Sequence, residues 1–132
     1  MTNLTAAKDD KRQNGHLVSV ALSNIKVFKG ANVSFNTSGY AKLAADTASE
    51  KFAGVAYETV DNSGGSAGDK SVRIFTSGVF SMACSSATQA WVGQTVYAVD
   101  DNVVALAATT TNDIPVGTVV AYVSATEVLV KI

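Results

Sequence analysis

The stretch SVRIFT, residues 71–76, decides the fold class, because polar and apolar side chains alternate along it. After a Ser-Gly pair the alternation continues in VFSM, residues 79–82. A period of two is the pattern of a β-strand, in which successive side chains point to opposite faces of the sheet. A one-residue slip would turn the apolar set toward water, so the pattern also predicts a well-specified register.

The rest of the chain from about Gly15 follows the same rhythm. Short apolar or alternating stretches are broken by Gly, Asn, Asp and Ser at intervals of about ten residues, which is typical of antiparallel strands. The expected strands are residues 17–22, 26–28, 33–35, 40–43, 52–58, 71–76, 79–83, 95–99, 103–107, 117–123 and 127–132. Two hairpins are predicted, with turns at residues 100–102 and 124–126. No repeat of fixed period is apparent.

These patterns predict an all-β fold, a small antiparallel β-barrel or sandwich-like domain, with a β-clip-like arrangement among the options. At most one short helix is expected, within residues 85–94, where Ser86 or Thr88 would cap it and Gly93 would end it. Residues 1–14 have few large apolar side chains and predict a flexible arm, whereas residues 15–132 predict a single β-rich domain.

Two smaller features complete the predicted organisation. The sole proline, Pro115, stands at the start of a strand, where the loss of one backbone donor is tolerated. Residues 61–69, DNSGGSAGD, form a Gly/Ser-rich loop that is long for a hairpin, and the composition predicts that this 61–69 loop is mobile.

Composition favours a protein with buried interfaces. The 132 residues are 47% hydrophobic and 16% charged, richer in apolar side chains and poorer in charge than an average soluble domain. The net charge is −1 and the basic residues do not cluster, which argues against nucleic acid as a partner. The first 15 residues lack the apolar core of a signal peptide, and no apolar stretch is long enough for a membrane span. The sequence therefore predicts a soluble protein made in the cytosol, with no membrane partner.

The residues that carry chemistry are too few to predict an active site. His16 is the only histidine and Cys84 the only cysteine, which excludes a His-rich metal site and an intramolecular disulfide. Neither has a legible base or carboxylate partner, so His16 is interpreted as a surface residue at a strand start and Cys84 as a small buried apolar side chain. We expect no catalytic residue, cofactor or metal.

Two further site interpretations stay open at this point. A calcium site is conceivable from loop carboxylates, but the ligand spacing of a helix-loop-helix motif is missing. The carboxylates concerned are Asp61, Asp69, Asp100, Asp101 and Asp113. Trp91 follows a turn and lies either at an oligomer interface, where tryptophan is enriched, or over the core of its own chain.

An ordered series of short motifs resembles a family of tailed-bacteriophage capsid cement, or head decoration, proteins. The series runs KFAGVA (51–56), GDKSVRI (68–74), SGVF (77–80), TQAWVGQTVYAVDDN (88–102), VGTVV (116–120) and SATEVLV (124–130). FKG (28–30) and SGYA (38–41) fit it more loosely upstream. Each piece is a common strand or turn sequence, and the specificity lies in their order and spacing over about 100 residues.

The resemblance implies a compact β-domain that assembles, often as a homotrimer, on the outside of the mature expanded capsid and strengthens it without catalysis. The expected partners are then the major capsid protein and further copies of the chain, and the expected location is the outer capsid surface of the virion. The arm could order against the shell, with Lys8, Lys11 and Arg12 pairing with shell carboxylates.

The alternative function is a carbohydrate- or receptor-binding β-module of a phage tail or cell surface. Its site would be formed by the 61–69 loop together with the turn of residues 100–102.

Overall fold

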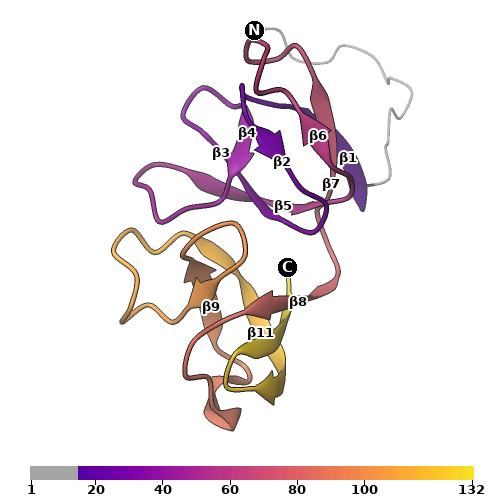
Figure 1. Cartoon of the computed structure of the whole chain (residues 1–132). Coiled ribbons are helices and arrows are strands. Elements are labelled where there is room, and N and C mark those ends of the chain that lie inside the picture. Colours follow the sequence, from indigo (N-terminus) through magenta and orange to yellow (C-terminus); the bar gives the residue numbers. More distant parts are fainter. Residues whose placement is uncertain (1–14) are drawn as a thin grey trace, which may run out of the picture.

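The computed structural model describes residues 15–132, which form an antiparallel β fold with one short 3₁₀ turn, so the all-β prediction is confirmed (Figure 1). The strands are β1 (Leu17–Ala21), β2 (Lys26–Val27), β3 (Asn32–Phe35), β4 (Ala41–Leu43), β5 (Lys51–Ala56), β6 (Val60–Asp61), β7 (Ser71–Phe75), β8 (Val79–Ala83), β9 (Thr95–Ala98), β10 (Val104–Ala105), β11 (Pro115–Ser124) and β12 (Glu127–Lys131). The 3₁₀ turn η1 covers Gln89–Trp91. All eleven expected strands and both hairpins are present, and β6 is the one strand that was not expected.

Residues 15–77, here called the first half, form a five-stranded sheet in the order β1-β7-β5-β3-β4. The sheet curls until its outer strands meet at a single parallel bridge between Leu22, just after β1, and Ala41 in β4. The amide of Ser23 donates to the carbonyl of Ala41 at 3.0 Å beside this bridge. β2 and β6 pair separately as a two-stranded sheet.

Residues 78–132, the second half, form another five-stranded sheet in the order β10-β9-β11-β12-β8. This sheet also curls until its outer ends meet at one parallel bridge, here between Ala83 at the end of β8 and Val103 just before β10. The chain passes from one half to the other at Ser77 and Gly78, directly between β7 and β8.

The two halves have the same topology. In each, the first strand pairs with the fifth, the fifth with the fourth, the fourth with the second and the second with the third, and the third meets the first through the parallel bridge. The five strands concerned are β1, β3, β4, β5 and β7 in the first half and β8, β9, β10, β11 and β12 in the second. The chain is thus an internal structural repeat, which corrects the expectation that it has none.

Hydrogen bonds outside the strand ladders give the register of the repeat. Gly30 donates to the carbonyl of Ala56 in the first half, and Gly93 donates to the carbonyl of Val119 in the second. Both positions are 63 residues apart. The same spacing relates the turn bond from Asn36 to Tyr40 and the bond from Val99 to Val103.

The spacing falls to 56 residues for the fifth strand. Thr76 donates to the carbonyl of His16, and Ile132 donates to that of Gly78. The difference of seven residues corresponds to the 61–69 loop, which the second half replaces with the tight β11–β12 turn. In sequence the repeat survives only in scattered matches, such as LAADT (43–47) against LAATT (106–110).

One glycine is required at the same place in each half. A Cβ on Gly54 in β5 would lie 2.1 Å from the carbonyl oxygen of Phe75, and a Cβ on Gly117 in β11 would lie 2.2 Å from that of Lys131. Only glycine allows the fourth and fifth strands to approach this closely.

Two hydrophobic clusters fill the molecule, and the larger one joins the halves. The smaller cluster belongs to the first half and includes Leu22 and Val72. The larger cluster fills the second half, with Val96 and Val128 completely buried, and also takes in Val55 from β5 of the first half. The two halves therefore share buried apolar surface and pack as one unit.

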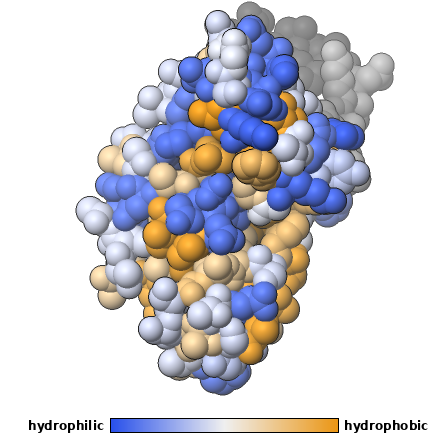
Figure 2. All heavy atoms as spheres, in the orientation of Figure 1, coloured by the Kyte–Doolittle hydropathy of each residue, from blue (hydrophilic) through white to orange (hydrophobic). Residues whose placement is uncertain are grey.

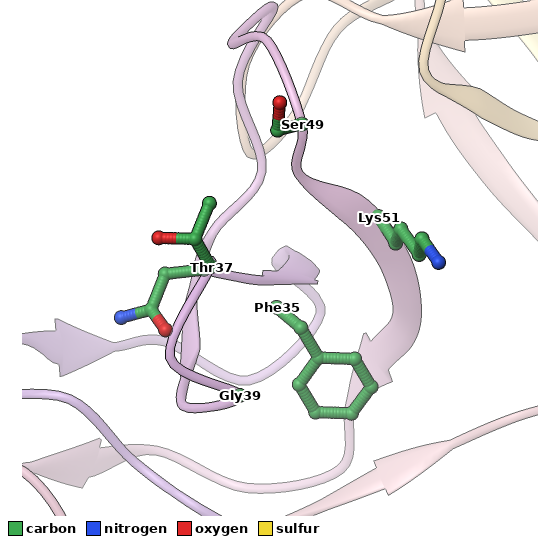
Figure 3. Close-up of a pocket in the computed structure, with 6 residues that line it drawn as sticks. Phe35, Thr37, Gly39, Ser49 and Lys51 are labelled. Carbon is green, nitrogen blue, oxygen red and sulfur yellow. The ribbon is translucent and has the colours of Figure 1, made fainter.

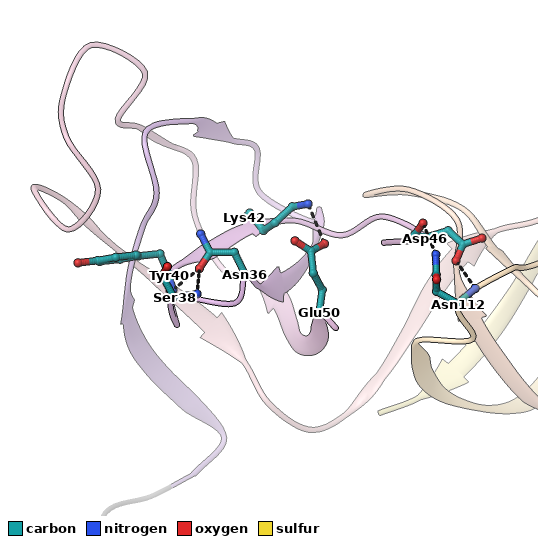
Figure 4. Close-up of polar contacts among 7 residues, drawn as sticks. All are labelled: Asn36, Ser38, Tyr40, Lys42, Asp46, Glu50 and Asn112. Carbon is teal, nitrogen blue, oxygen red and sulfur yellow. Dashed lines mark hydrogen bonds and ion pairs between the residues drawn. The ribbon is translucent and has the colours of Figure 1, made fainter. Parts of the chain in front are cut away.

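Polar contacts reinforce this junction (Figure 4). The carboxylate of Asp46 accepts hydrogen bonds from the amides of Thr111 and Asn112, both at 2.8 Å, and the Asn112 side chain donates back to the Asp46 carbonyl at 2.9 Å. The amide of Asn32 donates to the carbonyl of Asp101 at 2.7 Å. These bonds link the first half to two loops of the second.

The 61–69 loop is held in place, contrary to the prediction that it is mobile. The Asn62 side chain is 1% exposed, and its amide donates to the carbonyls of Leu22, Ser23 and Ser66. Within the loop, the amide of Ser66 donates to the carboxylate of Asp69 at 2.9 Å. One buried asparagine thus anchors a loop whose composition alone predicts freedom.

Candidate functional site

The two residues considered for catalysis lie in different halves and have structural partners. His16 is exposed just before β1, and its Nδ1 lies 2.6 Å from the Ser77 hydroxyl. Its placement at the surface of a strand start is confirmed. The carbonyl of the preceding Gly15 accepts a hydrogen bond from the Thr76 hydroxyl.

Cys84 is buried in the core of the second half, as the sequence predicts, with 6% of its surface exposed. Its Sγ lies 3.8 Å from the carbonyl oxygen of Ala125. Burial, and secondarily the negative charge of Glu127, raises the pKa of the thiol, so the reactive thiolate is disfavoured. Cys84 is a packing residue in this position.

The loop carboxylates do not converge. Among residues 15–132 no group of three or more His, Cys, Asp or Glu side chains is arranged to hold a metal ion. Most of these carboxylates instead accept hydrogen bonds from their own turns: Asp61 from Ser63, Asp69 from Ser66, Asp100 from Asn102 and Val103, and Asp113 from Thr110. The Ser63 hydroxyl is the largest cause of the lowered pKa of Asp61.

Trp91 lies in the core of its own chain, which is the second of the two placements considered. It ends η1, is 9% exposed and belongs to the larger cluster. Thr88 precedes the turn without a side-chain capping bond, and Gly93 follows it with φ +89°. A role for Trp91 in an oligomer interface stays a prediction.

The two loops proposed as a binding site do not meet. The 61–69 loop belongs to the first half and is anchored on Leu22 and Ser23, whereas residues 100–102 connect β9 to β10 in the second half. Figure 1 places them at separate parts of the molecule.

A shallow hollow lies elsewhere on the first half (Figure 3). Its volume is about 300 Å³, and it is lined by Phe35, Asn36, Thr37, Gly39, Ser49 and Lys51. The Asn36 carboxamide oxygen accepts bonds from the amides of Ser38 and Tyr40, so it serves the β3–β4 turn. The remaining groups offer one apolar ring, two hydroxyls and one cation, which could contact a small polar ligand but include no carboxylate for acid or base chemistry.

Exposed apolar side chains gather on the second half. Large hydrophobic residues with more than a third of their surface exposed are Val79, Val92, Val99, Val120, Tyr122 and Val123 in that half, and Phe28 and Tyr57 in the first. Residues 78–132 carry five charged side chains, against eleven in residues 15–77. On the face drawn in Figure 2, hydrophilic colour covers much of the first half, while the second half is largely pale to orange.

The most continuous part of this apolar surface runs along β11, which has no charged residue. β9 pairs with β11 only as far as Thr118. Beyond the bond between Gly93 and Val119, no strand of the described residues covers that side of residues 120–124. We define the β11 patch as Val92, Val120, Ala121, Tyr122, Val123 and Leu129. Sequence reasoning missed it, although the uncharged run 114–126 is a visible signal.

Lys8, Lys11 and Arg12, the expected capsid contacts, lie outside the described residues. Within residues 15–132 no helix has the length and apolar character needed to cross a membrane. Comparison of the chain with family models, with curated proteins and with solved structures finds no match.

Proposed function

We propose that this chain is a decoration, or cement, protein of a tailed phage, which binds the outside of the mature expanded head and stabilises it without catalysis. The observation that carries the proposal is the β11 patch: an uncharged apolar surface on a β molecule whose described polar groups do not converge on a reaction site. Contiguous exposed apolar surface on a small protein marks a site of protein association.

The motif series supports the proposal through the fold. KFAGVA coincides with β5, and VGTVV lies within β11. Gly54 and Gly117 are the glycines that the close approach of the fourth and fifth strands requires. The motifs that resemble the cement family are therefore residues that build the repeated fold.

The proposed assembly is a homotrimer on the major capsid protein, located on the outer surface of the virion after synthesis in the host cytoplasm. A trimer that touches the shell at three points gains effective concentration, so each contact can be modest while the whole is long-lived. Lys8, Lys11 and Arg12 of the N-terminal arm would add ion pairs to shell carboxylates.

The test is co-sedimentation of the purified protein with expanded heads that lack it, using unexpanded precursor heads as the comparison. Saturable binding to expanded heads alone is expected, because expansion would create the site. Binding to neither form would contradict the proposal.

The arm is tested separately by deleting residues 1–14. The shortened chain should bind expanded heads more weakly, and the loss should shrink as salt rises because exposed ion pairs are screened. Unchanged affinity would remove the arm from the proposed contact.

A second candidate, binding of a carbohydrate or receptor, is favoured by one observation, the hollow beside Phe35 and Lys51. An aromatic ring beside hydroxyl and cationic groups is a common way to hold a polar ligand. A glycan array distinguishes the two functions, since a cement protein should bind none of the glycans, whereas a selective hit abolished by Phe35→Ala would favour this second function.

A further inference from the structure

The β11 patch has an equivalent surface in the first half with the opposite chemistry. The spacing of the repeat pairs the six residues of the patch with six counterparts. The pairs are Lys29 with Val92, Tyr57 with Val120, Glu58 with Ala121, Thr59 with Tyr122, Val60 with Val123, and Arg73 with Leu129.

In the first half this surface is suited to water. Glu58 Oε2 and Arg73 Nε form an ion pair at 2.6 Å, and the Arg73 guanidinium lies 4.8 Å from the centre of the Tyr57 ring. The backbone edge is covered as well, because β6 (Val60–Asp61) pairs with β2 (Lys26–Val27).

In the second half the same surface is apolar and its edge is open. Ala121 lies opposite Leu129 in the β11–β12 register, where the first half has its ion pair. Val92, Val120 and Val123 are 39%, 43% and 49% exposed. The segment equivalent to β2 is the turn η1, so no strand of the described residues covers the end of β11. Proteins usually protect such an edge with charge, and here the charge is absent.

We infer that the β11 patch is the surface through which copies of this chain associate, each copy covering the patch of another. The inference rests on the proposed function in one respect, since it names the surface for the self-association proposed there. A second copy fits better than the shell protein does. A surface that waits in water for an expanded head suits mixed polar chemistry, whereas one that is covered from assembly onward is apolar.

The repeat supplies the variant that tests this inference. Ala121→Glu combined with Leu129→Arg copies the ion pair of the first half into the second, at positions where the same topology already accommodates it. The matched control exchanges the charges of the original pair, Glu58→Arg with Arg73→Glu, and leaves the β11 patch untouched. The measurement is the mass of the full chain in solution by light scattering after gel filtration, with far-ultraviolet circular dichroism as the check on folding.

Wild type and control should have the same mass, a multiple of 13.6 kDa, and the Ala121→Glu, Leu129→Arg variant should fall to 13.6 kDa with an unchanged spectrum. Should that variant fail to fold, Val92→Lys replaces it, because it carries the Lys29 counterpart at an exposed position and should also reduce the mass to that of one chain.

A folded variant that keeps the wild-type mass would overturn the inference, and so would a wild-type protein that is a single chain at all concentrations. Loss of head binding by the variant of a wild-type single chain would likewise overturn it and assign the patch to the shell. Because the mass is measured without heads, a multimeric wild type that binds no heads contradicts the cement function and leaves the patch assignment standing.

Discussion

The two halves of this molecule share one topology and differ in what covers them. The first half carries eleven charged residues, an ion pair on its fifth strand and the anchored 61–69 loop. The second half carries five charged residues, a larger core and the open β11 edge. The difference teaches that conservation of a strand order requires only a few buried valines and glycines, so that the outer surface of each copy of the repeat is free to take a different role.

The largest expected difference between the halves concerns Phe28 and Trp91, which occupy equivalent positions and accept equivalent turn bonds. Trp91→Ala should lower the free energy of unfolding by about 3–5 kcal/mol, because a buried aromatic is lost. Phe28 is 59% exposed, so Phe28→Ala should change stability by less than about 0.5 kcal/mol. Urea denaturation measures both. Equal effects would contradict the burial difference.

The equivalence of the halves is sharpened by Gly54→Ala and Gly117→Ala. Each added methyl group would meet a carbonyl oxygen of the neighbouring strand, so each variant should lose about 1–3 kcal/mol or more. Thermal unfolding of the two variants should show losses of similar size. A tolerated alanine at one position and not the other would show that the strands approach differently in the two halves.

A smaller effect, confined to the first half, is expected for Asn62→Ala. The substitution leaves three backbone carbonyls without a donor, which should cost about 1–3 kcal/mol and loosen the 61–69 loop. Hydrogen exchange should accelerate at the amide of Gly68, which donates to Leu22, while the amides of β12 keep their protection. Uniform acceleration throughout would instead indicate global destabilisation.

The smallest effect concerns the junction between the halves at acid pH. The amide of Thr111, then that of Asn112, holds the pKa of Asp46 below its usual value. A depressed folded-state pKa contributes stability that is present above the unfolded-state pKa and is lost as the pH falls through the folded-state value. Asp46→Asn should therefore lower stability at neutral pH and flatten its decline below about pH 4. An acid-unfolding curve parallel to that of the wild type would contradict this assignment.

Local pattern was enough to predict most of the fold. The alternation in SVRIFT is strand β7, Pro115 begins β11, and the turns at 100–102 and 124–126 connect the predicted hairpins. These features depend on neighbouring residues, since alternation and turn chemistry act over a few positions.

The features that local pattern missed depend on distant contacts. β6 is two residues long and exists because β2 lies across from it. The 61–69 loop is ordered through Asn62 bonds to carbonyls about 40 positions earlier in the chain. The repeat is hidden because its two copies agree mainly at isolated positions such as Gly54 and Gly117. The β11 patch could be found only once Ala121 and Leu129 were placed against Glu58 and Arg73.

The sequence by itself determined that this chain is an antiparallel β protein, where its strands and hairpin turns lie, and that His16 and Cys84 have no catalytic partners in view. Only the tertiary structure decided that the strands form two copies of one topology, that Trp91 is buried, and that one copy leaves an apolar edge open. The physical reason is that strand formation follows from local periodicity, whereas closure of a sheet, burial of a side chain and exposure of an edge depend on segments tens of residues apart.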